Sequence, residues 1–296
     1  MTAIVAENLG KRYGQRWALR HCTISVPAGR VVGLVGANGA GKTTLLHLAV
    51  GLLDATEGSI TALGGQPGAG ADQLARIGFL AQDAPVYPSL TVADHLRLGE
   101  GLNRQWDRDL AAHRIKRLGL PLGQRAGKLS GGQRSQLALT IAIGKRPEVL
   151  LLDEPVSSLD PLARRQFLQD LMELVAEHTP TVVLSSHLLS DIERVCDQLI
   201  VLADGHVRLD GPVDELLCTH KLLTGPRRDT TSLPQDQQPI RVSHTDRQTT
   251  VLVRTTQPIL DPRWIVTDVG LEDLVLAYMS PPSRDGRTGE LAAVPS

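Results

Sequence analysis

Short apolar runs lie along the chain, among them residues 31–35, 77–81, 149–152 and 181–185. A polar residue or a glycine follows each run. Runs of this length that are apolar at nearly every position are typical of strands buried on both faces, as in a parallel sheet covered by helices. We therefore predict an α/β domain in which these runs are strands of the central sheet.

The segments between these runs show two other periods. Residues 1–35 contain enough alternation of apolar and polar positions to predict strands that lead into the first apolar run. Between residues 82 and 132 apolar side chains such as Val92 and Leu96 recur at helical spacing. We therefore expect a helical subdomain at about residues 83–135.

A phosphate-binding loop follows the first run, because residues 36–43 read Gly-Ala-Asn-Gly-Ala-Gly-Lys-Thr between a predicted strand and a predicted helix. Its glycines let successive backbone N–H groups point at phosphate oxygens, and the start of the helix adds a favourable dipole. Lys42 is expected to reach the β- and γ-phosphates and Thr43 to bind Mg²⁺. The predicted nucleotide contacts are Gly36, Ala37, Asn38, Gly39, Ala40, Gly41, Lys42, Thr43 and Thr44. This loop alone leaves kinases, GTPases and many ATPases open.

An acidic pair ends the third run, where Asp153 and Glu154 follow residues 149–152. We expect this strand to lie beside the strand of the phosphate-binding loop, so that Asp153 holds Mg²⁺ through water. Glu154 would then accept a proton from the attacking water, as a general base. An isolated acidic pair at a strand end is more often a surface feature, and the loop upstream is what favours the catalytic interpretation.

A second glycine-rich motif, Leu-Ser-Gly-Gly-Gln at residues 129–133, precedes a helix predicted to start near Gln133. With the phosphate-binding loop and the acidic pair, it resembles the signature of the ATP-binding subunits of ABC transporters. The resemblance implies an α/β fold: a P-loop NTPase core, an antiparallel β subdomain, a helical subdomain and a small C-terminal α+β appendage. It also implies that Ser130, Gly131, Gly132 and Gln133 bind the ATP held by an opposite subunit, so that a dimer with two shared ATP sites is expected.

The same resemblance suggests roles for residues outside these motifs. Tyr13 resembles the aromatic residue that stacks on adenine, with Trp17 as the rival. Gln82, which follows the run 77–81, resembles the glutamine that senses Mg²⁺ and the attacking water.

Two further segments complete the resemblance. Residues 157–160 resemble the loop that crosses the dimer interface, with Asp160 as a predicted nucleotide contact. His187 resembles the histidine that contacts the γ-phosphate and positions Glu154. A single histidine at a strand end is more often structural, so this assignment depends on the order of the whole set.

Composition fits such a subunit. The formal net charge is -1, with 31 Lys and Arg against 32 Asp and Glu, which gives no electrostatic case for a nucleic-acid surface. The apolar stretches fall short of the ~20 residues of a membrane span, and the first residues lack a secretory signal pattern. Three scattered cysteines, Cys22, Cys196 and Cys218, predict neither a disulfide framework nor a zinc site.

The character of the chain changes near residue 220. Residues 1–220 are expected to form the ATP-binding cassette and residues 221–280 a linker with a small accessory region. Short strands are predicted at 240–242 and 249–253, and a helix at 271–279, whereas residues 281–296 are predicted to be disordered.

The sequence therefore predicts an ATP-hydrolysing subunit that requires ATP and Mg²⁺ and drives a separate integral membrane permease from the cytoplasmic face of the membrane. It is expected to work as a homodimer, or as a heterodimer with a second ATP-binding subunit. Resemblance to exporter-type subunits favours export, and the permease chooses the cargo. Two alternatives stay open: a soluble ABC ATPase of translation or DNA maintenance, and a module that binds ATP without hydrolysing it.

Overall fold

A computed structural model describes residues 1–157, 159–228, 233–234 and 236–280. The chain divides into two compact units, Met1–Asp210 and Gly211–Ser296. We call them the N-terminal unit and the C-terminal unit. The division lies ahead of residue 220, where the sequence suggested the end of the cassette. The predicted tail at 281–296 lies outside the described residues.

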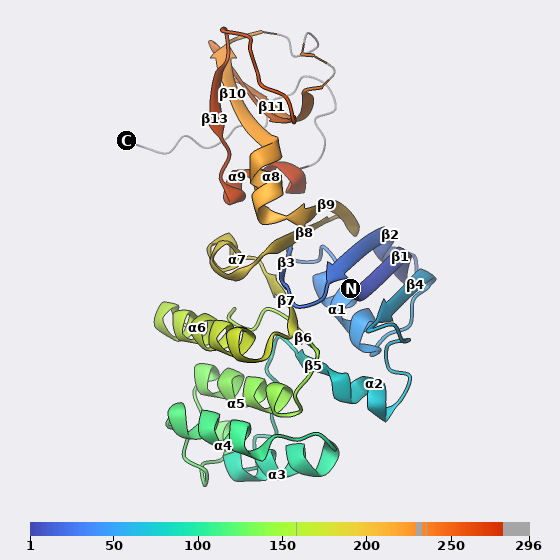
Figure 1. Cartoon of the computed structure of the whole chain (residues 1–296), viewed down its shortest axis with the longest axis vertical. Coiled ribbons are helices and arrows are strands. Elements are labelled where there is room, and N and C mark those ends of the chain that lie inside the picture. Colours follow the sequence, from blue (N-terminus) through green and yellow to red (C-terminus); the bar gives the residue numbers. More distant parts are fainter. Residues whose placement is uncertain (158, 229–232, 235, 281–296) are drawn as a thin grey trace. The chain divides into compact units, whose positions relative to one another are not determined.

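A six-stranded sheet forms the centre of the N-terminal unit (Figure 1). Its strands, in order across the sheet, are β5 (Ile77–Leu80), β6 (Val149–Leu152), β7 (Thr181–Ser186), β3 (Val31–Val35), β8 (Gln198–Ala203) and β9 (His206–Pro212). Strands β3, β6, β7 and β8 are buried at every position, as their apolar sequences require. The predicted parallel sheet is confirmed, because β5, β6, β7, β3 and β8 pair in parallel.

The order of these strands corrects one expectation. Strand β6, which ends at Asp153 and Glu154, is not the neighbour of β3, because β7 lies between them. The carboxyl end of β7 therefore brings His187 between the phosphate-binding loop and the acidic pair. Strand order depends on how the crossover helices pack, and a single sequence carries no local signal for it.

An antiparallel sheet of β2 (Arg16–Pro27), β1 (Thr2–Tyr13) and β4 (Glu57–Ala62) accompanies the central sheet. Helix α1 (Lys42–Val50) lies within the same apolar core as residues of β1, β2, β3 and β6. The short helix α2 (Ala71–Arg76) leads into β5. The hairpin between β1 and β2 turns at residues 14–15, which places Tyr13 and Trp17 near the start of α1.

The helical part contains α3 (Val92–Leu102), α4 (Arg108–Arg117), the 3₁₀ helix η1 (Ala126–Lys128) and α5 (Gly131–Gly144). Side chains that accept N–H groups start three of them: Thr91 for α3, Asp107 for α4 and Ser130 for α5. Helix α5 begins two residues before the predicted Gln133 and continues past residue 135 to pack near β5. The helices α6 (Pro161–His178) and α7 (Leu189–Val195) complete the N-terminal unit.

The described residues of the C-terminal unit form a four-stranded antiparallel sheet and two helices. Its strands run in the order β11 (Gln238–His244), β12 (Gln248–Arg254), β10 (His220–Pro226) and β13 (Ile265–Asp268). Its helices are α8 (Val213–Thr219) and α9 (Leu271–Met279). Strands β11 and β12 and helix α9 confirm the predicted elements. Strand β10 was missed because its sequence ends in Gly-Pro and was interpreted as a linker.

A buried histidine connects α8, β10 and α9. His220 is 0% exposed, with Nδ1 2.6 Å from the carbonyl oxygen of Leu216 and Nε2 2.8 Å from the hydroxyl of Tyr278. A carbonyl can only accept, so Nδ1 carries the proton and Nε2 accepts from Tyr278. Burial lowers the pKa of His220, which favours this neutral form.

We expect the stability of the C-terminal unit to fall as the pH is lowered from 7.5 to 5.5. Below about pH 6.5 the unfolded chain binds a proton at His220 that the folded unit excludes, which costs at most about 1.4 kcal/mol per pH unit. Hydrogen-exchange protection of β10 and α9, corrected for intrinsic rates, measures the effect. The His220→Gln variant should show lower stability with a flatter pH dependence, and an unchanged slope in this variant would exclude His220 as the cause.

Candidate nucleotide site

The phosphate-binding loop joins the end of β3 to the start of α1 at the carboxyl edge of the central sheet. None of its three glycines can be replaced without strain, and Gly39 has a φ of 81°. A Cβ atom on Gly36 would lie 2.4 Å from the carbonyl oxygen of Leu202, and Gly41 has a φ of 108°, which side chains rarely adopt. The backbone thus curls tightly enough to present its N–H groups to an anion.

A cavity of about 560 Å³ opens over this loop. Its walls come from the β1–β2 hairpin, the phosphate-binding loop, the end of β5 and the end of β6. The residues that line it are Tyr13, Arg16, Trp17, Ala18, Asn38, Gly39, Gly41, Lys42, Thr43, Thr44, Gln82 and Glu154. Its volume falls within the usual range of small-molecule sites.

Both aromatic candidates for adenine contact line this cavity. The Tyr13 side chain is 50% exposed, with Lys11 Nζ 5.6 Å from its ring centroid. Trp17 is half-buried and lies near two guanidinium groups, those of Arg12 and Arg20. The hairpin therefore offers Tyr13 as the more accessible ring.

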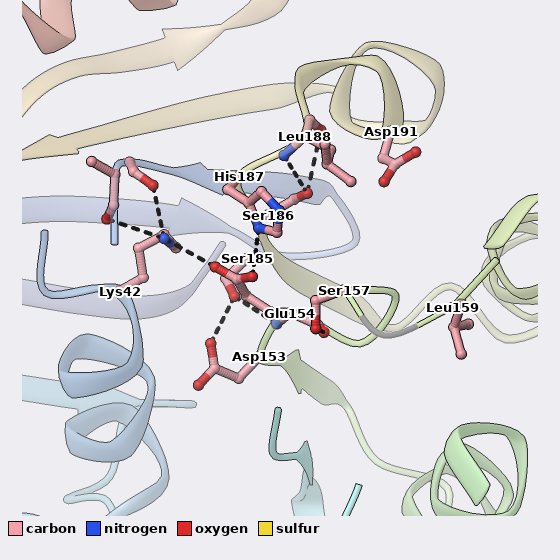
Figure 2. A network of polar contacts seen from close by, with 12 residues as sticks. Lys42, Asp153, Glu154, Ser157, Leu159, Ser185, Ser186, His187, Leu188 and Asp191 are labelled. Atoms are coloured by element: carbon pink, nitrogen blue, oxygen red, sulfur yellow. Dashed lines mark hydrogen bonds and ion pairs between the residues drawn. The ribbon is translucent and has the colours of Figure 1, made fainter. Parts of the chain in front are cut away.

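A chain of polar contacts centres on Glu154 (Figure 2). Its Oε1 lies 3.1 Å from Lys42 Nζ, and its Oε2 lies 2.6 Å from His187 Nδ1. Lys42 also donates to the carbonyl oxygens of Gly36, at 2.7 Å, and Ala37, at 3.3 Å. These contacts join the phosphate-binding loop, the end of β6 and the end of β7 at one point.

Glu154 has an unusual backbone and a perturbed acidity. Its φ is 46°, in the left-handed region, and its N–H donates to Ser185 Oγ at 2.8 Å. Burial raises the pKa of Glu154, but hydrogen bonds from Lys42 and His187 and their charges outweigh burial, so the net shift is downward. The carboxylate is therefore ionised at neutral pH and can accept a proton.

Ser185, which no sequence motif singled out, connects the two acidic residues. Its hydroxyl donates to Asp153 Oδ1 at 2.7 Å and accepts from the N–H of Glu154. A serine at a strand end two residues before a histidine is too common a pattern to have been chosen from one sequence. Its role becomes visible only when β6 and β7 are paired.

The residues expected to hold Mg²⁺ suit that ion. Magnesium in nucleotide sites usually takes one or two carboxylates with the substrate phosphates and water. The Thr43 hydroxyl and the Gln82 amide line the cavity, and Asp153 is 1% exposed with only Oδ1 hydrogen-bonded among the described residues. The same described part of the chain contains no cluster of three or more His, Cys, Asp or Glu side chains arranged for a metal. The hydroxyl of Thr43, the amide of Gln82 and the carboxylate of Asp153 are oxygen donors of the kind that Mg²⁺ takes together with phosphates.

The signature residues lie apart from this cavity. Ser130 is exposed and caps α5, where its hydroxyl accepts from the N–H of Gln133 and Gln133 Oε1 accepts from the N–H of Ser130. Gly131 and Gly132 form the first turn of α5, and none of the four residues lines the cavity. The motif is therefore a helix start presented at the surface of the chain.

The structure places the remaining predicted site residues outside the lining of the cavity. Five of them are not among the residues that line the cavity: Gly36, Ala37, Ala40, Asp153 and His187. Asp160 caps α6, because its Oδ1 accepts from the N–H groups of Leu162 and Ala163. Ser158, in the predicted interface loop, lies outside the described residues.

A second cavity, of about 830 Å³, lies at the opposite, amino edge of the central sheet. Its two arginines already have acidic partners: Arg76 Nε lies 2.5 Å from Glu148, and Arg146 Nε lies 2.7 Å from Asp107. Although it is larger, this cavity lacks the phosphate-binding loop and the ionised pair of Lys42 and Glu154. The groups that can bind phosphate therefore favour the smaller cavity as the nucleotide site.

Comparison with known proteins identifies the family of the chain. A family model described as ABC transporter matches residues 19–157, and one described as AAA domain, putative AbiEii toxin, Type IV TA system, matches residues 122–193. The aliphatic sulfonates import ATP-binding protein SsuB of Shigella flexneri serotype 5b (strain 8401) is 36% identical over 215 residues, which are 72% of this chain and 82% of that protein. The chain belongs to the ATP-binding subunits of ABC transporters. As an ABC ATPase it binds and hydrolyses ATP.

Other relatives of this ABC subunit carry similar names. The SsuB protein of Pseudomonas putida is 38% identical over 217 residues, with coverage of 72% of this chain and 77% of that protein. The ABC transporter ATP-binding protein YdbJ of Bacillus subtilis (strain 168) is 30% identical over 207 residues, which are 69% of this chain and 67% of that protein. The expectation of export is not supported, because both SsuB proteins are named for import.

Solved structures show the same fold. An ATP-binding subunit of an ABC transporter aligns with a TM-score of 0.65 at 27% identity, over 73% of this chain and 92% of that one. The dimeric structure of MJ0796, a bacterial ABC transporter cassette, aligns with a TM-score of 0.63 at 26% identity, over 71% of this chain and 98% of that chain. The predicted ABC ATPase fold is confirmed. Among the described residues of our ABC subunit, no helix is long and apolar enough to cross a membrane.

Proposed function

We propose that the chain hydrolyses Mg²⁺-ATP between two cassettes and thereby drives a separate membrane permease. The observation that carries this proposal is the division of the site: the cavity holds Lys42 and Glu154, while the signature start of α5 is exposed elsewhere on the same chain. A cavity that the signature residues do not line, and an exposed anion-binding helix start elsewhere on the same chain, suit a dimer in which each copy completes the other's site. The relative MJ0796 has been solved as a dimer.

The chemistry proposed for the cavity follows from its contacts. Lys42 and the backbone N–H groups of the loop bind the phosphates, and Tyr13 stacks on the adenine. Glu154 accepts the proton of the attacking water, while His187 fixes the orientation of the carboxylate through Nδ1. Bound Mg²⁺ would neutralise phosphate charge, with Thr43, Gln82 and Asp153 as its protein partners.

The partners are part of the proposal. A second copy of this chain, or a related ATP-binding subunit, supplies Ser130, Gly131 and Gly132 to the γ-phosphate. ATP-driven closing and opening of the pair is transmitted through the region after Gln82 to the permease. In this arrangement the chain would work at the cytoplasmic face of the membrane. The permease sets cargo and direction, and the import names of the relatives favour uptake over the export expected from the sequence.

Affinity purification of the chain from detergent-solubilised membranes, followed by mass spectrometry, tests the transport role. Recovery of a polytopic membrane protein in matching amount would support it and would identify the permease. Recovery from the soluble fraction alone, with ribosomal or DNA-repair proteins, would overturn the transport role and leave the ATPase activity standing.

A further inference from the structure

A charged pair lies between α6 and α7, the helices that follow Glu154 and His187 in the chain. Arg164 lies on the first turns of α6, and Asp191 lies on α7. Arg164 Nε is 3.9 Å from Asp191 Oδ2, which is too long for a hydrogen bond. Both atoms are buried and have no other hydrogen-bond partner among the described residues.

Such an arrangement is costly as it stands. A buried donor or acceptor without a partner loses the hydration it had in the unfolded chain. Burial also raises the pKa of Asp191, although the charges of Arg164, Arg194 and His187 act in the opposite direction. A small approach of α6 and α7 would convert two unpaired atoms into one charge-assisted hydrogen bond. Unsatisfied buried groups of this kind call for an explanation.

The position of the pair supplies that explanation. Arg164 also donates from Nη2 to the carbonyl oxygen of Leu159, at 3.4 Å, in the loop before α6. In that loop, Ser157 Oγ donates to the carbonyl oxygen of Glu154 at 3.0 Å. Asp191 is four residues beyond His187, and its N–H donates to the carbonyl oxygen of Leu188. Figure 2 shows Leu159 and Asp191 on the two segments that approach Glu154.

We propose that Arg164 and Asp191 are positioning residues that hold Leu159 and His187 in one arrangement around Glu154. The contact between Nε and Oδ2 shortens to a hydrogen bond when that arrangement is competent for hydrolysis. This inference rests on the roles proposed for Glu154 and His187. It assigns no contact with ATP to either residue, since neither lines the cavity.

Steady-state phosphate release by the full-length chain, measured against ATP concentration, tests the pair. We expect Arg164→Met and Asp191→Asn each to lower kcat by about 10- to 100-fold, the value of one charge-assisted hydrogen bond, with KM for ATP changed less than about threefold. The double variant should be no slower than the slower single variant, because the two residues act as a unit. Arg164→Lys should recover part of the rate, since it keeps a cation facing Asp191.

Two matched controls separate positioning from folding. Arg165→Met and Glu193→Gln change exposed neighbours on the same helices and should leave kcat at the parental value. Additive losses, or losses that follow thermal stability alone, would overturn the proposal, as would an Arg164→Met variant with the rate of Arg165→Met. If the Arg164 and Asp191 variants keep the parental kcat while Glu154→Gln is inactive, only the positioning role of Arg164 and Asp191 is overturned. If Glu154→Gln itself retains the parental rate, the proposed hydrolytic site fails.

Discussion

Replacing Glu154 with glutamine is expected to lower the rate of ATP hydrolysis by about 10²- to 10⁴-fold, the usual contribution of a positioned general base. The amide keeps the size of the side chain and can still accept from Lys42 through its oxygen. It cannot accept a proton from water. Nucleotide affinity should hold or rise, because Lys42 no longer faces a carboxylate 3.1 Å away that competes with phosphate.

The measurement pairs single-turnover hydrolysis with equilibrium binding of ATP. Glu148→Gln is the matched control, since Glu148 stands at the other end of the same strand, is exposed and pairs with Arg76. That variant should hydrolyse ATP at the parental rate. A Glu154→Gln protein that also hydrolyses at this rate would remove Glu154 from the role of base.

Much of this fold could be predicted because its signals are local. The run at 149–152 is apolar at all positions, and it forms strand β6 with the same bounds. The loop at 36–43 could be identified for a related reason: a tight anion-binding turn requires glycine at set positions, as Gly36 and Gly41 show. Both features depend on residues that are adjacent in the sequence, so one sequence is enough to predict them.

Features that depend on distant parts of the chain were missed or misplaced. Strand β7 between β3 and β6, the Ser185 hydroxyl that links Asp153 to Glu154, and the pair Arg164 and Asp191 all join segments far apart in sequence. Strand β13 was also missed, because four residues, all exposed, carry no burial pattern. Contacts of this type arise from packing, and no periodicity in one sequence encodes them.

The site also shows why the order of motifs was more informative than any single residue. His187 alone resembles many structural histidines, yet strand β7 places its Nδ1 2.6 Å from Glu154. Ser130, by contrast, caps a helix outside the cavity, so its predicted contact with ATP needs a second chain. One chain brings together the groups for phosphate binding and proton acceptance.

Replacing Lys42 with alanine is expected to weaken ATP binding by about 30-fold to several thousand-fold, because truncating one partner of a desolvated charge pair costs about 2–5 kcal/mol. Lys42 is 5% exposed and is held by the carbonyl oxygens of Gly36 and Ala37. Calorimetric titration with ATP measures the loss. Lys116→Ala, which removes an exposed lysine of α4, should bind ATP as the parent does.

The same change should also destabilise the N-terminal unit, since it leaves the Glu154 carboxylate, 7% exposed, without the Lys42 ammonium group and with His187 as its remaining side-chain partner. The double variant Lys42→Ala with Glu154→Gln separates the two effects. Neutralising residue 154 removes the buried charge that has lost Lys42, so the unfolding midpoint in urea should return toward the parental value, whereas ATP binding should stay weak. Recovery of binding in the double variant would show that Lys42 acts only by neutralising Glu154, and it would contradict a direct contact with phosphate.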